Sequence, residues 1–393
     1  MDLERLREDT PGCAERVHLN NAGASLMPRP VVDAARLHLD LEARIGGYEA
    51  AAEASHAIAQ AYADVAELLD TSPGNVAFTE HATASFTQAL SSLRWESGDV
   101  LLTTRNDYVS NQIQYLALAR RFGVQVLRAP DAPEGGVDLH AMETLIHRRR
   151  PRLVAVTHVP TNSGLVQDVA ALGSMCRARD VLFLVDACQS VGQMPVFPET
   201  MGCDFLSATA RKFLRGPRGA GFLWVSERVL DSDLEPLFPD LRGADWIEEN
   251  LYQPAPDATR FETWEFAWAL VLATGAAARY ASDLGLGAIC RRSRALASTI
   301  RTRLEALEGA RVLDRGAELA AIVTASFEGH RPSDLVRALR ERCVNTSSQT
   351  RLDAVLDYDA KGVDGALRIS PHYFNTEDEI DVLVEALADI LTG

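Results

Sequence analysis

The first 230 or so residues alternate short apolar runs with stretches in which apolar residues recur at helical spacing. Several of the short runs are apolar throughout, as parallel strands covered on both faces should be. The runs that read as strands are 76–79, 100–104, 124–129, 153–158, 181–186, 205–208 and 221–225. Helical patterns lie between them at 82–93, 111–122, 139–149 and 169–179. This alternation predicts an α/β domain with a mostly parallel, seven-stranded sheet.

After this region the pattern changes, and prolines at 236, 239, 254 and 256 punctuate a connecting stretch. The elements expected beyond it are helices at 265–282, 287–307, 332–343 and 376–391 and strands at 320–327 and 366–370. Thr376 and Glu379 form a capping box that marks the start of the last helix. We therefore predict a segment 1–20 that packs with the small domain, a large α/β domain over 21–255 and a small α+β domain over 256–393.

Composition excludes several classes of protein. The formal net charge is −16, and an acidic surface repels nucleic-acid phosphates. The N-terminus lacks the apolar core of a signal peptide, and the most apolar stretch, 266–278, is too short to cross a bilayer. The six cysteines show no CxxC spacing, which indicates free thiols in a reducing cytoplasm and no metal site. We expect neither a nucleic-acid partner nor a membrane.

Polar residues follow the predicted strands, at the sheet edge where ligands of α/β proteins collect. Asp186 ends one strand, and Gln189 follows one turn later. Lys212 stands at the mouth of another strand. Taken alone, Asp186 is more simply an acid satisfied by backbone donors or an arginine. An acid and a lysine at separate strand ends, however, suit a cofactor that has a cationic ring nitrogen to pair with the acid and an aldehyde to bond with the lysine. Pyridoxal phosphate is such a cofactor.

A phosphate group would need hydrogen-bond donors nearby. Ala82, Thr83 and Ser85 place small residues and hydroxyls where a helix should begin, and helix N-termini bind anions. A plain helix cap by Thr83 or Ser85 is the simpler alternative. Thr209 and Arg211, beside the lysine, would add a hydroxyl and a cation.

The glycines of residues 216–221 form GxxGxG before a strand, rather than the nucleotide-binding GxGxxG before a helix. This spacing indicates a turn and argues against a nicotinamide dehydrogenase.

Taken in order, these motifs resemble the class V aminotransferase-like enzymes of fold type I, which use pyridoxal phosphate. That group includes cysteine desulfurases, isopenicillin N epimerase-like proteins and C–S lyases. The resemblance covers nearly the whole chain. The stretches that carry it are HLNNAG (18–23), FTEHATASF (78–86), NDYVSN (106–111), HVPTNSGLVQDV (158–169), VDACQSVGQMPV (185–196), ARKFLRGPRGAGFLWV (210–225) and RISPHYFNT (368–376).

The resemblance implies a role for each matching residue. Lys212 would hold the cofactor as a Schiff base and move the substrate's α-proton. Asp186 would keep the pyridine nitrogen protonated, and Gln189 would bond the ring oxygen O3′. Arg368 would bind the substrate carboxylate with its forked guanidinium.

The remaining implied positions surround these four. The phosphate would be held by Ala82, Thr83, Thr209 and Arg211, the ring would stack on Tyr108 and approach Thr161 or Asn162, and the substrate side would be lined by Asn21, Ala22 and Gly23. Two features depart from the family pattern. Arg211 replaces the usual histidine before the lysine, and residues 260–265 replace a Gly-Thr turn that reaches the phosphate across the dimer in desulfurases.

The resemblance also bears on the reaction. Desulfurases carry a persulfide-forming cysteine shortly before the carboxylate-binding arginine, but residues 345–370 hold none, and we expect Cys343 to be buried in packing. We therefore predict a C–S lyase that performs β-elimination on an S-substituted cysteine, and not a persulfide-forming desulfurase. Amino-acid epimerisation, transamination and decarboxylating oxidative deamination are the alternatives. The joint presence of Lys212, Asp186, Gln189 and Arg368 argues against a non-catalytic protein. The resemblance further implies a homodimer.

Overall fold

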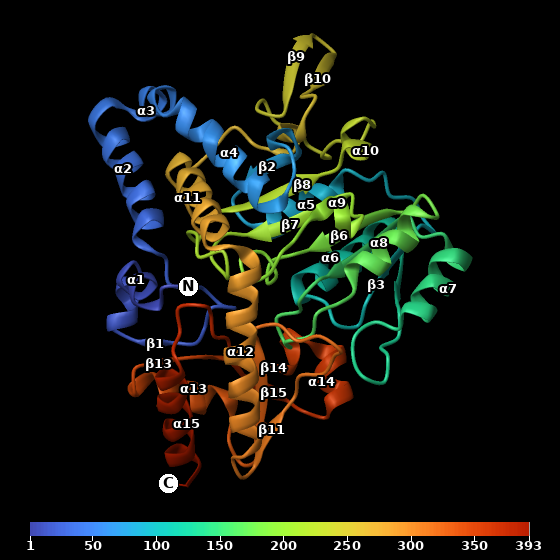
Figure 1. The fold of residues 1–393 in the computed structure, drawn as a ribbon. Helices are drawn as coiled ribbons and strands as arrows, with labels where there is room; N and C mark the ends of the chain where they lie inside the picture. Colours follow the sequence, from blue (N-terminus) through green and yellow to red (C-terminus); the bar gives the residue numbers. More distant parts are fainter. Residues whose placement is uncertain (393) are drawn as a thin grey trace.

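A seven-stranded sheet forms the centre of the larger part of the molecule in the computed structural model, which describes residues 1–392 (Figure 1). Its strand order is β2-β8-β7-β6-β5-β3-β4. The strands are β2 (Val76–Thr79), β3 (Val100–Thr103), β4 (Gln125–Arg128), β5 (Leu153–Thr157), β6 (Leu182–Asp186), β7 (Phe205–Thr209) and β8 (Gly221–Val225). Neighbouring strands from β4 to β7 are parallel, and β8 runs antiparallel to β7 and β2. The predicted mostly parallel α/β sheet is confirmed.

Alternate side chains of the strands enter two apolar clusters, one on each face of the sheet. In β6, Phe183 and Val185 belong to one cluster and Leu184 to the other. Because successive side chains of a strand point to opposite faces, burial on both faces requires an uninterrupted apolar run. The covering helices are α5 (Ala82–Ser91) and α6 (Val109–Phe122) on the side of Leu184, and α7 (Leu139–Arg149) and α8 (Val169–Arg177) on the other.

The C-terminal part of the chain is built on a smaller antiparallel sheet of order β11-β12-β15-β14. Its strands are β11 (Ala310–Val312), β12 (Val323–Phe327), β14 (Ser347–Thr350) and β15 (Gly365–Ile369). The accompanying helices are α12 (Leu286–Glu305), α13 (Pro332–Glu341), α14 (Val355–Lys361) and α15 (Glu377–Thr392). The capping box of α15 is confirmed, because the Glu379 N–H donates to Thr376 Oγ1 at 3.1 Å and the Thr376 N–H donates to Glu379 Oε2 at 3.2 Å.

The N-terminal segment joins both parts of the molecule. β1 (Val17–His18) pairs in parallel with β13 (Val344–Asn345) beside the smaller sheet. Farther along this segment, α2 (Arg29–Ile45) and α4 (Ser55–Leu69) pack against α11 (Trp268–Leu284) on one side of the larger part (Figure 1). The remaining helices are α1 (Leu3–Glu8), α3 (Gly47–Glu53), α9 (Pro198–Met201) and α10 (Glu227–Leu230). Across residues 1–392, none of the helices combines the length and apolarity needed to cross a bilayer.

The structure contains elements that the sequence analysis did not predict, and it overturns one prediction. The proline-punctuated stretch contains a hairpin, β9 (Ala244–Glu248) and β10 (Leu251–Pro254), which projects from the larger part in Figure 1. Its side chains are mostly exposed, so the apolar alternation that reveals a half-buried strand is missing. The prediction that Cys343 is buried is wrong, because α13 ends before it and Cys343 lies exposed with φ 60°.

Candidate active site

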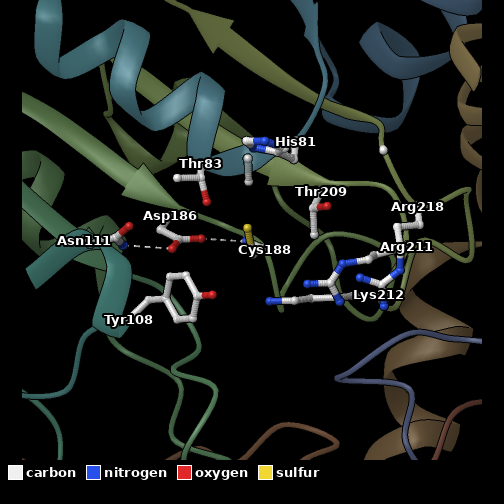
Figure 2. A pocket seen from close by; sticks show the side chains of 12 residues that line it. His81, Thr83, Tyr108, Asn111, Asp186, Cys188, Thr209, Arg211, Lys212 and Arg218 are labelled. Carbon is white, nitrogen blue, oxygen red and sulfur yellow. Dashed lines mark hydrogen bonds between the residues drawn. The ribbon is translucent and has the colours of Figure 1, made fainter. Parts of the chain in front are cut away.

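A cavity of about 350 Å³ lies at the carboxyl ends of β6 and β7 and at the start of α5 (Figure 2). Its size falls within the range of small-molecule sites. Side chains predicted from separate parts of the sequence meet there. Those that line the cavity are Ala82, Thr83, Tyr108, Asp186, Thr209, Arg211 and Lys212.

Asp186 is an oriented carboxylate at the inner wall of this cavity. It is 3% exposed, and two donors hold it. Asn111 Nδ2, from α6, donates to Asp186 Oδ2 at 2.9 Å, and the Cys188 N–H donates to Asp186 Oδ1 at 3.0 Å (Figure 2). No arginine or lysine forms an ion pair with Asp186 in the part of the chain that the structure describes. The carboxylate is therefore available to pair with a cationic group of a ligand.

Lys212 follows β7 and is 7% exposed. Within residues 1–392 no hydrogen bond or ion pair engages its amine, whose Nζ lies 5.7 Å from the centroid of the Tyr108 ring. Burial lowers the pKa of Lys212, which favours the neutral amine that condenses with an aldehyde. The chain has only one other lysine, Lys361, and its Nζ is paired with Asp357 Oδ2 at 2.7 Å.

Other residues that line the cavity are suited to binding an anion. In the described chain, no acceptor binds the backbone N–H groups of Ala82 and Thr83 at the start of α5. The hydroxyl of Thr209 and the guanidinium of Arg211 line the same space. Free N–H groups at a helix N-terminus, together with a cation, are a common arrangement for binding phosphate.

A second group of predicted residues lies beside the cavity and is joined through Thr161. Arg368, on β15, donates from Nη1 to Thr161 Oγ1 at 2.5 Å and from Nη2 to Asn20 Oδ1 at 3.3 Å. Gln189 Nε2 donates to the same Thr161 Oγ1 at 3.2 Å and to the Ala22 carbonyl at 3.1 Å. Arg368 Nε has no partner within residues 1–392. Burial lowers the pKa of Arg368 to about 10, which leaves the guanidinium charged at neutral pH.

The other predicted residues mainly support this arrangement. Asn162 Nδ2 donates to Asp357 Oδ2 at 2.7 Å, so Asn162 is engaged elsewhere while Thr161 contacts the arginine and the glutamine. Asn21 Nδ2 donates to the Ser370 carbonyl at 2.8 Å. The Gly23 carbonyl accepts a hydrogen bond from Arg211 Nη1, which brings the N-terminal segment against the cavity wall.

Five cavity residues were absent from the sequence-based prediction: His81, Asn111, Cys188, Arg218 and Gly219. Asn111 and Cys188 lie inside the matching stretches NDYVSN and VDACQS, so their proximity to the site could have been proposed. Arg218 and Gly219 were assigned to a turn, and only the folded path of that turn brings them to the cavity. Burial raises the pKa of the Cys188 thiol well above its ordinary value.

The donor set fits pyridoxal 5′-phosphate. Lys212 matches the aldehyde, Asp186 matches a protonated ring nitrogen, and the start of α5 matches the phosphate. A solved structure of the same fold, 22% identical, holds this cofactor.

Comparisons with known proteins agree with this fit. Residues 17–383 match the family model described as aminotransferase class-V. A probable cysteine desulfurase of Methanothermobacter thermautotrophicus is 28% identical over 99% of this chain and 98% of its own length. A probable hercynylcysteine sulfoxide lyase of Mycobacterium tuberculosis is 31% identical over 94% of this chain and 89% of its own length. The apo structure of a cysteine desulfurase from Thermococcus onnurineus NA1 has a TM-score of 0.91 at 26% identity, covering 99% of this chain and 98% of that one.

These comparisons correct the reaction predicted from the sequence. The exclusion of a desulfurase in favour of a C–S lyase, an epimerase or a transaminase is wrong, because proteins named as cysteine desulfurases match this chain from end to end. The exclusion depended on one residue type in one short segment. The residues predicted to hold the cofactor and the substrate carboxylate, such as Lys212 and Asp186, lie in other segments of the chain.

Proposed function

Because the chain belongs to the aminotransferase class-V family and uses pyridoxal 5′-phosphate, we propose that this enzyme removes the sulfur atom of L-cysteine as a cysteine desulfurase. The observation that carries the proposal is that Lys212 and Asp186 line one cavity, with Arg368 near enough for its charge to act on Lys212, in a chain that matches a probable cysteine desulfurase over 99% of its length. The second lysine of the chain is held by an aspartate, which leaves Lys212 as the one free candidate anchor within residues 1–392.

Asp186, Lys212 and Arg368 would each have a separate role in the reaction. When bound, pyridoxal phosphate withdraws electrons from the substrate's α-carbon. Asp186 supplies the fixed negative charge that holds the ring nitrogen protonated. Lys212, whose pKa is lowered by burial, accepts and returns the α-proton near neutral pH. Arg368 receives the substrate carboxylate through the N–H of its unpartnered Nε.

Sulfur removal also needs a thiol that accepts the sulfur. A thiolate attacks the substrate's sulfur, an S–S bond forms, and the Cβ–S bond breaks with its electron pair left on carbon, which then takes up a proton. The balanced products are alanine and the acceptor's persulfide. Cys188, the cysteine that lines the cavity, is buried with a raised thiol pKa and so is a poor thiolate. We therefore supply the acceptor from solution in the test.

The test is to incubate the cofactor-loaded enzyme with L-cysteine and excess dithiothreitol, and to identify the carbon product. We expect alanine and sulfide in equal amounts, and neither product from Lys212→Ala. Arg148→Ala, at an exposed position away from the cavity, serves as the matched control and should retain both products. Pyruvate and ammonia in place of alanine would contradict the proposal, because they are the products of β-elimination.

We also propose that the enzyme is a homodimer. Large apolar side chains are exposed on the β9–β10 hairpin and just before it; Phe238 is 81% exposed and Trp246 is 79% exposed. Exposed apolar groups of this size commonly mark an interface. Light scattering should give twice the chain mass of 42.8 kDa. A single-chain mass at micromolar concentration would argue against the dimer.

A further inference from the structure

Two arginines of the cavity lining have no acidic partner within residues 1–392. Arg211 and Arg218 both line it (Figure 2), and neither forms an ion pair in the described part of the chain. The only side-chain hydrogen bond of Arg211 is to the Gly23 carbonyl, and Arg218 has none within residues 1–392. Burial lowers the pKa of Arg211, and the charge of Arg218 lowers it further. Two guanidinium groups that line the same cavity repel each other, and an anion bound between them removes this repulsion.

The turn that carries Arg218 passes unusually close to the start of α5. A Cβ atom at Gly221 would lie 2.7 Å from the backbone nitrogen of Ala82 and 2.7 Å from the carbonyl oxygen of Ala208, so only glycine fits. Gly219, next to Arg218, has a φ of +87°, which also favours glycine. These glycines bring the backbone beside Arg218 against the first N–H groups of the helix.

His81 adds a third donor at this position. It is the N-cap of α5, and its Nδ1 accepts a hydrogen bond from the Ala84 N–H at 3.0 Å. A ring nitrogen that accepts carries no proton, so the proton of the neutral ring lies on Nε2. His81 lines the cavity, and no hydrogen bond of the described chain engages its Nε2.

We propose that Arg218 and His81 bind the cofactor's phosphate from the same chain, together with Arg211 and the first N–H groups of α5. The phosphate is the dianion that relieves the repulsion between the two arginines. Arg218 and His81 are both exposed, so they bind the phosphate from the solvent side. The inference concerns the cofactor and not the reaction, so it holds or fails independently of the desulfurase proposal.

The experiment compares two forms of the cofactor that differ only in the phosphate. Dissociation constants of pyridoxal 5′-phosphate and of pyridoxal are measured by titrating the full-length apo-protein and following absorbance. A charge-assisted hydrogen bond to phosphate corresponds to a change of about tenfold. We therefore expect Arg218→Ala to weaken pyridoxal 5′-phosphate binding about tenfold and to leave pyridoxal binding unchanged.

Further variants show whether Arg218 acts through its positive charge or through a structural role. Arg218→Lys should recover part of the lost affinity, His81→Ala should give a smaller loss in the same direction, and Arg148→Ala should match the parent protein. Inorganic phosphate should compete with pyridoxal 5′-phosphate in the parent protein and compete more weakly in Arg218→Ala. An unchanged affinity in Arg218→Ala would overturn the proposal. An equal loss of pyridoxal and pyridoxal 5′-phosphate binding would also overturn it, because it would assign Arg218 a structural role.

Discussion

Asn111 Nδ2 donates to Asp186 Oδ2 at 2.9 Å, and this bond ties the inner carboxylate of the cavity to α6. Asn111 Nδ2 also lies 3.2 Å from Asp107 Oδ1, so one amide orients two buried acids. A carboxylate that must face a cationic ring nitrogen gains from a donor that fixes its direction without neutralising its charge.

Replacing Asn111 is therefore expected to lower kcat. Asn111→Ala should reduce kcat by about ten- to a hundredfold, because the loss of one buried hydrogen bond to a charged group is worth roughly 1.5–3 kcal/mol. Asn111→Asp should reduce it further, because a third acid would repel Asp186. The rate of alanine formation by cofactor-saturated protein measures both.

The matched control is Gln112→Ala. Gln112 Nε2 donates to Asp107 Oδ2 at 3.0 Å but makes no bond with Asp186. Gln112→Ala should leave kcat within about twofold of the parent value if Asn111 influences kcat through Asp186. Equal losses in Asn111→Ala and Gln112→Ala would assign the effect to Asp107 instead.

Thr161 is expected to control substrate affinity. Its hydroxyl accepts hydrogen bonds from both Arg368 and Gln189, so Thr161→Val removes the shared acceptor without changing the shape of the side chain. We predict an increase of about tenfold in KM for L-cysteine with a smaller change in kcat. Steady-state kinetics decide this, with the exposed Thr299→Val as control. A lowered kcat at constant KM would refute the prediction.

The amine of Lys212 should react at lower pH than an ordinary lysine. Burial lowers its pKa, so the neutral form appears below the usual range near 10.5. Between the lowered pKa and 10.5 the unfolded chain binds more protons at this group than the folded chain, so its contribution to stability rises with pH in that window. Acylation of the apo-protein at a series of pH values, read by mass spectrometry, measures the shift. Identical profiles for Lys212 and the aspartate-paired Lys361 would disprove it.

Glu262 is expected to stabilise the fold. It is 2% exposed and accepts hydrogen bonds from the Phe78 N–H at 2.7 Å, Tyr62 Oη at 2.8 Å and Arg242 Nε at 2.8 Å. Glu262→Ala leaves these donors without a partner and should lower the free energy of unfolding by about 3–5 kcal/mol. Urea unfolding measures this, and the exposed Glu265→Ala should change it by less than about 0.5 kcal/mol. Similar stabilities of the two variants would be inconsistent with the role assigned to Glu262.

The sequence predicts the sheet well because its strands are buried on both faces. Runs such as 181–185 must then be apolar throughout, and the carboxyl ends of the strands place Asp186 and Lys212 at one edge of the sheet. The β9–β10 hairpin gives no such signal because its side chains are mostly exposed.

The cavity residues also differ in how well the sequence predicts their positions. Asp186 is predictable because its position at the end of a strand fixes its place. Arg218 is not predictable, because it reaches the cavity only through a turn whose glycines allow close contact with α5. The reaction is the least predictable feature: the absence of a cysteine from residues 345–370 concerns one segment, whereas similarity to desulfurases extends over the whole chain.

The most direct test of the whole account is to find which lysine carries the cofactor. The chain offers only Lys212 and Lys361, so borohydride reduction of the loaded enzyme followed by peptide mass spectrometry gives a two-way answer. We predict a phosphopyridoxyl group on the peptide that contains Lys212 and an unmodified Lys361. A modified Lys361, or no modification of either lysine in cofactor-saturated protein, would contradict the account.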